Sequence, residues 1–232
     1  MIVPTYNERG SIEEVTKRLF AESPAVDLLV VDDGSPDGTA QFVRGLSRSD
    51  GRIQLLERNL KTGLGDAYVA GFRWALERGY DIVVEMDADL SHDPGEVPRL
   101  VAALGAAELA IGSRYVPGGR VVNWGRFRRA LSRFGNIYAG FWLRFGVKDS
   151  TSGFRAFRAS ALEAQDLSSV ASHGYAFQIE MTRRIHAVGG RVVEVPITFI
   201  ERETGDSKMS RRIVIEALRQ VTAWGIRDRF RH

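Results

Sequence analysis

Two short apolar runs that each end in aspartates constrain the fold of this chain more than any other feature. Leu28–Val31 is followed by Asp32-Asp33, and the mostly apolar Ile82–Met86 is followed by Asp87-Ala88-Asp89. Short apolar runs of this kind are typical of buried strands in a parallel sheet. Ligands of open α/β folds bind at the carboxyl ends of such strands. The two runs therefore predict an acidic ligand site at one edge of a parallel sheet.

The rest of the chain alternates in the same way between strand-like and helix-like segments. Strands are expected at 28–31, 53–56, 82–86, 109–112, 154–157 and 192–199, the last interrupted by Pro196. Helices are expected after Ser11, Asp37 and Pro94, and over about 66–77, 134–145, 177–188 and 210–230. This alternation predicts an α/β fold with a mostly parallel sheet and helices on both faces. No internal repeat or linker divides the chain, so one domain over 1–232 is expected.

Two local patterns give further expectations. Ser11 followed by Glu14 predicts a capping box that opens the first helix. Residues 115–130 hold one proline, three glycines and four arginines, which predicts a long loop, and long loops in compact domains are often functional.

Composition sets the class of protein. The chain of 232 residues is 44% hydrophobic and 26% charged, which is ordinary for a globular protein. It has no cysteine, so a disulfide framework and a thiolate metal site are both excluded. No apolar run approaches the roughly 18–20 residues that span a bilayer. The chain starts directly with the strand-like Ile2-Val3-Pro4, so no signal peptide is expected.

The net charge of +3 hides a strongly basic segment. Residues 109–148 contain no acidic residue and eight basic ones. These are Arg114, Arg120, Arg126, Arg128, Arg129, Arg133, Arg144 and Lys148. Such a local excess predicts a polyanionic partner, for which substrate phosphates, anionic lipid headgroups and nucleic acid all remain candidates.

The acidic strand ends point to a divalent cation. Asp87 and Asp89 could aim two carboxylates at one hard cation that also holds a diphosphate. The alternative is an ordinary turn, since Asp is common there, but two acidic strand ends in one alternating fold favour the ligand site. His92 lies three residues beyond Asp89, and a lone histidine is more often neither a ligand nor a proton carrier. Gly63-Leu64-Gly65 lacks the residues of a P-loop, and tight packing explains it.

Three polar segments carry weaker signals. Tyr6 and Glu8 could stack on a base and accept a hydrogen bond from it, or could form a turn. Residues 150–157 could frame the floor of an active site or make a plain turn. Arg202 and Lys208 could close over a diphosphate, although composition alone favours a solvated loop.

Several of these motifs, taken in order, resemble glycosyltransferase family 2. They are PTYNE, VVDDGSPDGT, DADLSHDP, GSRY, TSGFRAF, GYAFQIEM and EVPITFIERETGDSKMS. Within the family they resemble the dolichol-phosphate, or polyprenol-monophosphate, mannosyltransferases. The runs VVNWGRFRRALSRFGN and VTAWGIRDRF are similar to the actinobacterial polyprenol monophosphomannose synthases. The resemblance implies a GT-A (Rossmann-like) fold, Mg²⁺ or Mn²⁺, GDP-mannose as donor and a polyprenyl phosphate as acceptor.

The resemblance also assigns roles to residues. Donor binding is implied for Pro4, Tyr6, Glu8, Val31, Asp33, Asp87, Ala88, Asp89, Arg114, Arg202 and Lys208. Acceptor phosphate binding is implied for Arg114, Arg128 and Ser132, and metal ligation for Asp87 and Asp89. Asp89 and Arg114 are the implied catalytic residues. Ser91 stands where some relatives carry a metal-binding glutamine, which puts direct ligation there in doubt and suggests an intervening water.

The implied reaction transfers mannose with inversion to a phosphate monoester, which is largely ionised at pH 7 and needs no general base. The aromatic residues of 134–145, with nearby arginines, suggest an amphipathic interfacial helix at the cytoplasmic face of a membrane. Attachment would then be peripheral or through a separate membrane protein. The same helix could instead pack as core. A polyprenyl-phosphate glucosyltransferase that uses UDP-glucose is the nearest alternative, and a non-catalytic nucleic-acid-binding module is a remote one. No nucleic acid is expected, because the arginines adjoin the proposed diphosphate site and the acidic strand ends would repel phosphates without a metal.

Overall fold

A seven-stranded sheet forms the centre of the computed structural model, which describes residues 1–59, 63–172, 174–201 and 211–230. The strands are β1 (Ile2–Thr5), β2 (Leu28–Asp32), β3 (Ile53–Glu57), β4 (Ile82–Glu85), β5 (Leu109–Ser113), β7 (Arg155–Arg158) and β8 (Val192–Pro196). Their order across the sheet is β3-β2-β1-β4-β7-β5-β8. Each neighbouring pair is parallel except the two pairs that β7 makes. The mostly parallel α/β sheet predicted from the sequence is confirmed.

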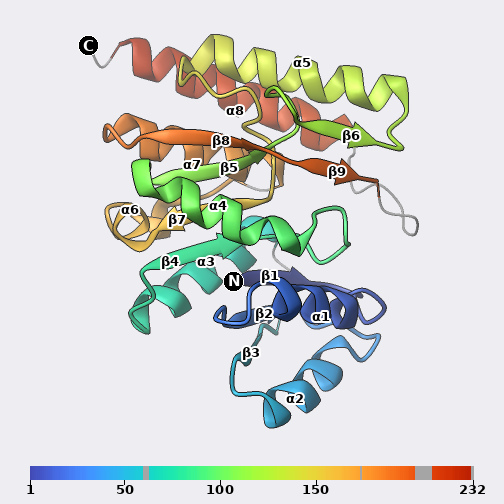
Figure 1. The fold of residues 1–232 in the computed structure, drawn as a ribbon. Helices are drawn as coiled ribbons and strands as arrows, with labels where there is room; N and C mark the ends of the chain where they lie inside the picture. Colours follow the sequence, from blue (N-terminus) through green and yellow to red (C-terminus); the bar gives the residue numbers. More distant parts are fainter. Residues whose placement is uncertain (60–62, 173, 202–210, 231–232) are drawn as a thin grey trace.

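Helices cover both faces of this sheet (Figure 1). They are α1 (Ile12–Glu22), α2 (Thr39–Ser49), α3 (Leu64–Glu77), α4 (Val97–Ala103), α5 (Arg126–Leu143), α6 (Ala159–Glu163), α7 (Tyr175–Ala187) and α8 (Arg211–Arg229). Side chains alternate along each strand, so β2 sends Leu29 and Val31 into one apolar cluster with α3 and α7. Leu28 and Val30 enter the other cluster, with α1 and α4. This double burial explains why the strands read as continuous apolar runs.

Strand β7 runs against its neighbours. It pairs antiparallel with β4 through Val84 and Ala156, and with β5 through Ala110 and the same Ala156. An antiparallel strand begins at the edge where its parallel neighbours end. The segment 149–153, just before β7, therefore arrives beside Asp87 and Asp89.

A second, two-stranded sheet replaces part of the expected loop at 115–130. β6 (Arg120–Val122) pairs in parallel with β9 (Thr198–Ile200), and α5 already begins at Arg126. The long-loop prediction is wrong because β9 supplies a partner strand from a distant part of the chain. The expected interruption at Pro196 is confirmed, since β8 ends there and β9 follows.

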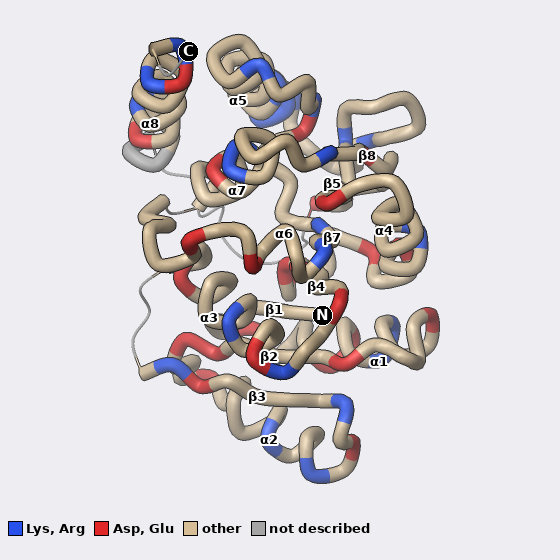
Figure 2. The backbone as a smooth tube through the Cα atoms, turned by 90° about the vertical axis from the view of Figure 1, so that its left-hand side faces the viewer, with Lys and Arg blue, Asp and Glu red and all other residues tan. Residues whose placement is uncertain are grey.

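Helices α5 and α8 lie side by side at one end of the molecule (Figure 1). The Tyr138 hydroxyl lies 2.5 Å from the Thr222 Oγ1 atom, and a Cβ at Gly225 would lie 2.9 Å from the Trp142 ring. From the first pair to the second, the residue number rises on both helices, so the two helices run in the same direction. Basic residues mark α5, and residues of both signs mark α8, at this end of the molecule (Figure 2).

The predicted capping box at Ser11 is wrong. The Ser11 hydroxyl donates to the carboxylate of Glu8 at 2.9 Å and makes no cap bond to the helix. The backbone carbonyl of Glu8 accepts instead from the amides of Ser11 and Ile12. Glu8, rather than Glu14, therefore organises the start of α1.

No helix in the described part of the chain is both long and apolar enough to cross a bilayer.

Candidate active site

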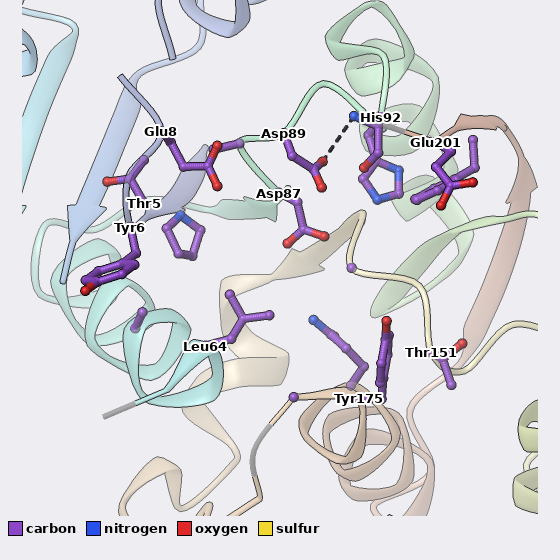
Figure 3. A pocket seen from close by; sticks show the side chains of 18 of the residues that line it. Thr5, Tyr6, Glu8, Leu64, Asp87, Asp89, His92, Thr151, Tyr175 and Glu201 are labelled. Atoms are coloured by element: carbon purple, nitrogen blue, oxygen red, sulfur yellow. Dashed lines mark hydrogen bonds between the residues drawn. The ribbon is translucent and has the colours of Figure 1, made fainter. Parts of the chain in front are cut away.

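A cavity of about 280 Å³ opens at the carboxyl edge of β1, β2 and β4. We call this cavity the donor pocket, after the role that the resemblance implies for its residues. Figure 3 shows Tyr6 and Glu8 at one end of it, and Thr151, Tyr175 and Glu201 at the other. Asp87 and Asp89 lie between the two ends with their carboxylates toward the space (Figure 3). The cavity lies where ligands of open α/β sheets bind.

Asp87 and Asp89 are held at the end of β4 by local hydrogen bonds. The Tyr68 hydroxyl, buried in α3, donates to Asp87 Oδ1 at 3.3 Å. The backbone amide of Ser91 donates to Asp89 Oδ1 at 3.1 Å. Leu90 between them has a φ of +61°, an uncommon conformation for a non-glycine residue. Such local strain is concentrated at functional sites.

The donor atoms of this strand end fit a divalent cation. Two carboxylates supply hard oxygen ligands, and Mg²⁺ commonly takes one or two protein carboxylates with the rest from phosphates and water. In the described ranges no group of three acidic or histidine side chains is placed to hold a metal. Ser91 lines the pocket, and its buried hydroxyl makes no hydrogen bond to any described residue. That hydroxyl suits a water or phosphate oxygen.

The end of the pocket at Tyr6 and Glu8 brings together residues that the resemblance implies hold the nucleoside. Pro4, Tyr6, Glu8 and Asp33 all line it. Asp33 pairs with Arg58 at 3.0 Å, an arginine that the sequence gave no reason to select. The side chain of Val31 does not line the cavity, because it is fully buried in the core.

Arg114 lies at the end of the pocket near Thr151 and Tyr175, where Asp149 holds its side chain in place. The Arg114 Nε donates to Asp149 Oδ2 at 2.7 Å, and Nη2 donates to Oδ1 at 2.6 Å. Both side chains are buried, Asp149 completely. Burial alone would raise the pKa of Asp149, but the Arg114 guanidinium outweighs it and holds this pKa below 3.8. Arg114 also donates to Thr151 Oγ1 at 2.9 Å, which anchors the segment before β7.

Arg128 is placed differently. Its guanidinium pairs with the carboxylate of Glu201, and both side chains are partly exposed. The Arg128 Cζ atom lies 4.6 Å from the ring centre of Trp124, and the Arg114 Cζ atom lies 5.3 Å from it. The Trp124 ring therefore contacts both guanidiniums. Ser132, one turn further along α5, accepts a hydrogen bond from the Tyr115 hydroxyl at 2.8 Å.

A second cavity, of about 80 Å³, continues from this end between α5 and α8. We call it the apolar groove. It is lined by Leu131, Phe134, Tyr138, Ile179, Val214, Leu218 and Val221, together with Ser132. Five residues line both cavities, namely Arg114, Trp124, Arg128, Thr151 and Tyr175. The donor pocket and the apolar groove thus share a wall that carries two arginines.

Two further buried titratable groups are His92, which lines the pocket, and Glu85, which does not. His92 packs against Phe154 and Phe199, and burial lowers its pKa to about 4, so it is neutral at pH 7. Glu85 is fully buried beside Arg155, at 3.5 Å, and burial raises the pKa of Glu85 to about 8. Arg155 donates to the carbonyls of Ser150, Ser152 and Gln178. It thereby ties the segment before β7 to α7.

The comparisons with known proteins agree with this geometry. The model of the family "Glycosyl transferase family 2" matches residues 1–165. The chain belongs to glycosyl transferase family 2.

Two relatives of this family 2 chain match almost its whole length. It is 51% identical over 229 residues to an undecaprenyl-phosphate mannosyltransferase of Micrococcus luteus, covering 99% of this chain and 94% of the relative. It is 52% identical over 231 residues to a polyprenol monophosphomannose synthase of Mycolicibacterium smegmatis, covering 99% and 87%. A dolichol-phosphate mannosyltransferase of Pyrococcus furiosus is 37% identical and is covered over 62% of its length.

Solved structures show the same fold. Glucosyl-3-phosphoglycerate synthase from Mycobacterium tuberculosis, in complex with Mn²⁺, UDP-glucose and phosphoglyceric acid, matches with a TM-score of 0.69. The sequence identity is 22%, over 96% of this chain and 78% of that one. The GT-A-like fold expected from the sequence is confirmed.

The structure brings together most of the residues to which the resemblance assigns a role. Of the residues implied to bind donor or acceptor, the structure brings Pro4, Tyr6, Glu8, Asp33, Asp87, Ala88, Asp89, Arg114 and Arg128 to the donor pocket and Ser132 to the groove. Arg202 and Lys208 lie outside the described residues. Trp124, Asp149, Tyr175 and Glu201 were missed. Trp124, Tyr175 and Glu201 lie inside motifs that carried the resemblance, and Asp149 lies two residues before one of them, but no role was assigned to any of the four.

Proposed function

We propose that this protein transfers mannose from GDP-mannose to a polyprenyl phosphate, giving polyprenyl phosphate mannose and GDP. The observation that carries the proposal is the wall shared by the donor pocket and the apolar groove. An acidic pocket suits a sugar nucleotide bound through a cation, and an apolar groove suits an isoprenoid chain. The arginines between them suit the phosphate of the acceptor. The names of the relatives support mannose and a polyprenyl phosphate for this chain.

In the proposed reaction an oxygen of the acceptor phosphate attacks C1 of mannose. The bond between C1 and the diphosphate oxygen breaks, and GDP leaves with the electron pair. The attacking phosphate monoester has a second pKa near 6, so no side chain has to remove a proton from it at pH 7. Attack from the face opposite the leaving GDP inverts C1. This suits a site in which donor and acceptor enter from two cavities.

The residues of the shared wall orient the two anions. Arg128 can contact the acceptor phosphate, and Arg114 is directed toward both cavities by its rigid pair with Asp149. Pro4, Tyr6, Glu8 and Asp33 would hold the guanosine at the end of the donor pocket away from the shared wall. Val31 could contribute only its backbone there.

Asp87 and Asp89 would hold Mg²⁺ or Mn²⁺. When bound, such an ion neutralises charge that develops on the departing diphosphate. Arg202 and Lys208, outside the described residues, are proposed to assist at the same phosphates.

We further propose that the protein lies peripherally on the cytoplasmic face of a membrane, where a separate membrane protein could also anchor it. On α5, Phe127, Phe134, Ile137 and Phe141 recur at intervals of seven, three and four residues and are 53–82% exposed. This spacing places them on one face of the helix. Arg126, Arg129 and Arg133 are exposed on the same helix. Trp142, which the sequence placed on this surface, instead packs between α5 and α8.

The decisive test is transfer of radiolabelled mannose from GDP-mannose to a short polyprenyl phosphate by the purified protein, with UDP-glucose assayed in parallel. Labelled lipid from GDP-mannose and none from UDP-glucose is the expected result. Labelling from UDP-glucose alone would keep the acceptor and replace the sugar. A folded protein that labels no lipid from either donor would refute the proposal.

A further inference from the structure

The two arginines of the shared wall differ in how firmly their carboxylate partners hold them. Arg114 and Asp149 are 5% and 0% exposed, and the pair is joined by two side-chain hydrogen bonds. Removing one partner of such a buried pair leaves an uncompensated charge and is strongly destabilising. Arg128 and Glu201 are 26% and 29% exposed. A partly exposed pair contributes little to stability, so its carboxylate can be exchanged for another anion.

The backbone around Glu201 fixes where its carboxylate lies. The Glu201 amide donates to the Val122 carbonyl at 3.1 Å, and the Ile200 amide donates to the Ser91 carbonyl at 3.0 Å. The end of β9 is thus joined on one side to β6 and on the other to the loop that follows Asp89. Glu201 lines the donor pocket at its acceptor end (Figure 3).

The position of Arg128 does not depend on Glu201 alone. Its guanidinium packs on the ring of Trp124, with 4.6 Å from Cζ to the ring centre. Cation–π contacts of this kind hold a guanidinium in place without using its N–H groups. If the Glu201 carboxylate moves away, the Trp124 ring still presents Arg128 to the shared wall.

We propose that Glu201 occupies the anion position on Arg128 when no acceptor is present, and that the phosphate of the acceptor displaces it. This inference rests on the proposed function, because it takes the acceptor to be a phosphate monoester. Glu201 is then a specificity-determining residue. A doubly charged phosphate can replace a carboxylate on a guanidinium, whereas an uncharged polyprenol cannot, since its hydroxyl would leave the guanidinium without an anion.

The test compares Glu201→Gln with the wild type in steady-state transfer from GDP-mannose to a short polyprenyl phosphate. Loss of the competing charge should lower KM for the acceptor by about three- to fivefold, the factor that a partly exposed ion pair represents. KM for GDP-mannose should not change. Glu57→Gln is the matched control, because Glu57, at the end of β3, forms an exposed ion pair with Arg44 of α2 and does not line the pocket. Its acceptor KM should equal that of the wild type.

Two binding measurements make the result independent of turnover. Calorimetry with the same short polyprenyl phosphate, and with inorganic phosphate, should show tighter binding of both to Glu201→Gln by a similar factor. Tighter binding of the polyprenyl phosphate alone, without tighter binding of inorganic phosphate, would contradict the proposal. Glu201 would then act on the isoprenoid chain rather than on the phosphate. In an Arg128→Gln background the Glu201→Gln change should have no effect on either affinity.

A rise in the acceptor KM of Glu201→Gln, instead of a fall, would identify a competing explanation. If Glu201 serves to orient Arg128 for the phosphate, Glu201→Gln raises the acceptor KM and weakens both ligands, and the proposal is wrong. An unchanged KM also overturns it. Should Glu201→Gln fail to fold, Glu201→Asp replaces it in the same assays, because its side chain is one methylene shorter and reaches Arg128 less well. A lower acceptor KM for this variant supports the proposal, and a higher or unchanged one overturns it. Wild-type protein that transfers no mannose would refute the proposed function instead, and the phosphate titrations would still test the exchange at Arg128.

Discussion

Asp149 holds Arg114 at three points, by hydrogen bonds from the Arg114 Nε, Nη2 and backbone amide at 2.7, 2.6 and 2.8 Å. The Asp149 side chain that accepts these three hydrogen bonds is fully buried. Its own backbone amide donates to Glu194 on β8 at 2.9 Å. The position of Arg114 between the two cavities is therefore set by residues far from it in sequence.

Asp149→Asn should destabilise the fold by about 3–5 kcal/mol, because it leaves the Arg114 charge buried without its partner. Chemical denaturation of the purified variant measures this loss. Because Arg114 holds the pKa of Asp149 below 3.8 in the folded state, the pair stabilises the wild type above about pH 4. That stability is lost as the pH falls through the lowered pKa. The variant should lack this acid-dependent step, and a loss of less than about 1 kcal/mol would contradict the account.

Asp89→Asn should reduce mannose transfer by about 100-fold or more, because a carboxylate that would hold the cation at the leaving diphosphate is lost. EDTA should reduce the wild-type rate similarly, and added Mg²⁺ or Mn²⁺ should restore it. Asp81→Asn is the matched control, since Asp81 is an exposed aspartate that directly precedes the first residue of β4, at the end of the strand away from Asp89. Full activity of Asp89→Asn, or of wild type in EDTA, would exclude this role.

Replacing Ile137 and Phe141 by serine should reduce binding to anionic vesicles by about tenfold or more. These side chains are 71% and 65% exposed on α5, and burial of apolar surface drives interfacial binding. Co-sedimentation with vesicles of mixed phosphatidylcholine and phosphatidylglycerol measures the bound fraction. Val188→Ser, at a 63% exposed residue following α7, is the control. Unchanged sedimentation of the double variant would refute a membrane contact through α5.

Glu85→Gln should make stability less dependent on pH between about 5 and 8. The folded-state pKa of Glu85, about 8, lies above its ordinary value of 4.5 because the group is buried. The folded protein then binds a proton that the unfolded chain has released, so stability falls as the pH rises through this range. Glutamine is neutral throughout. Thermal melts of both proteins at several pH values compare the slopes, and parallel slopes would contradict the raised pKa.

The donor half of the site was predictable because its signals are local. Asp87 and Asp89 follow an apolar run directly, and the carboxyl ends of parallel strands meet at one edge whatever the strand order. Tyr6 and Glu8 reach the same pocket by the same rule, from the end of β1.

The acceptor half depends on contacts between distant segments. Arg114 meets Asp149 across 35 positions, and Arg128 meets Glu201 across 73. The expected loop at 115–130 contains β6 only because β9 pairs with it. The strand at 154–157 was expected, but no local pattern gives the direction in which it joins the sheet. Local propensity carries no information on such partners.

The two cavities are lined largely by two successive parts of the chain. Most of the nucleotide end of the pocket comes from the first 113 residues, whereas the apolar groove is lined only by residues from Arg114 onward. Substitutions from Arg114 onward can therefore reshape the apolar groove, while the residues among the first 113 that line the donor pocket stay unchanged.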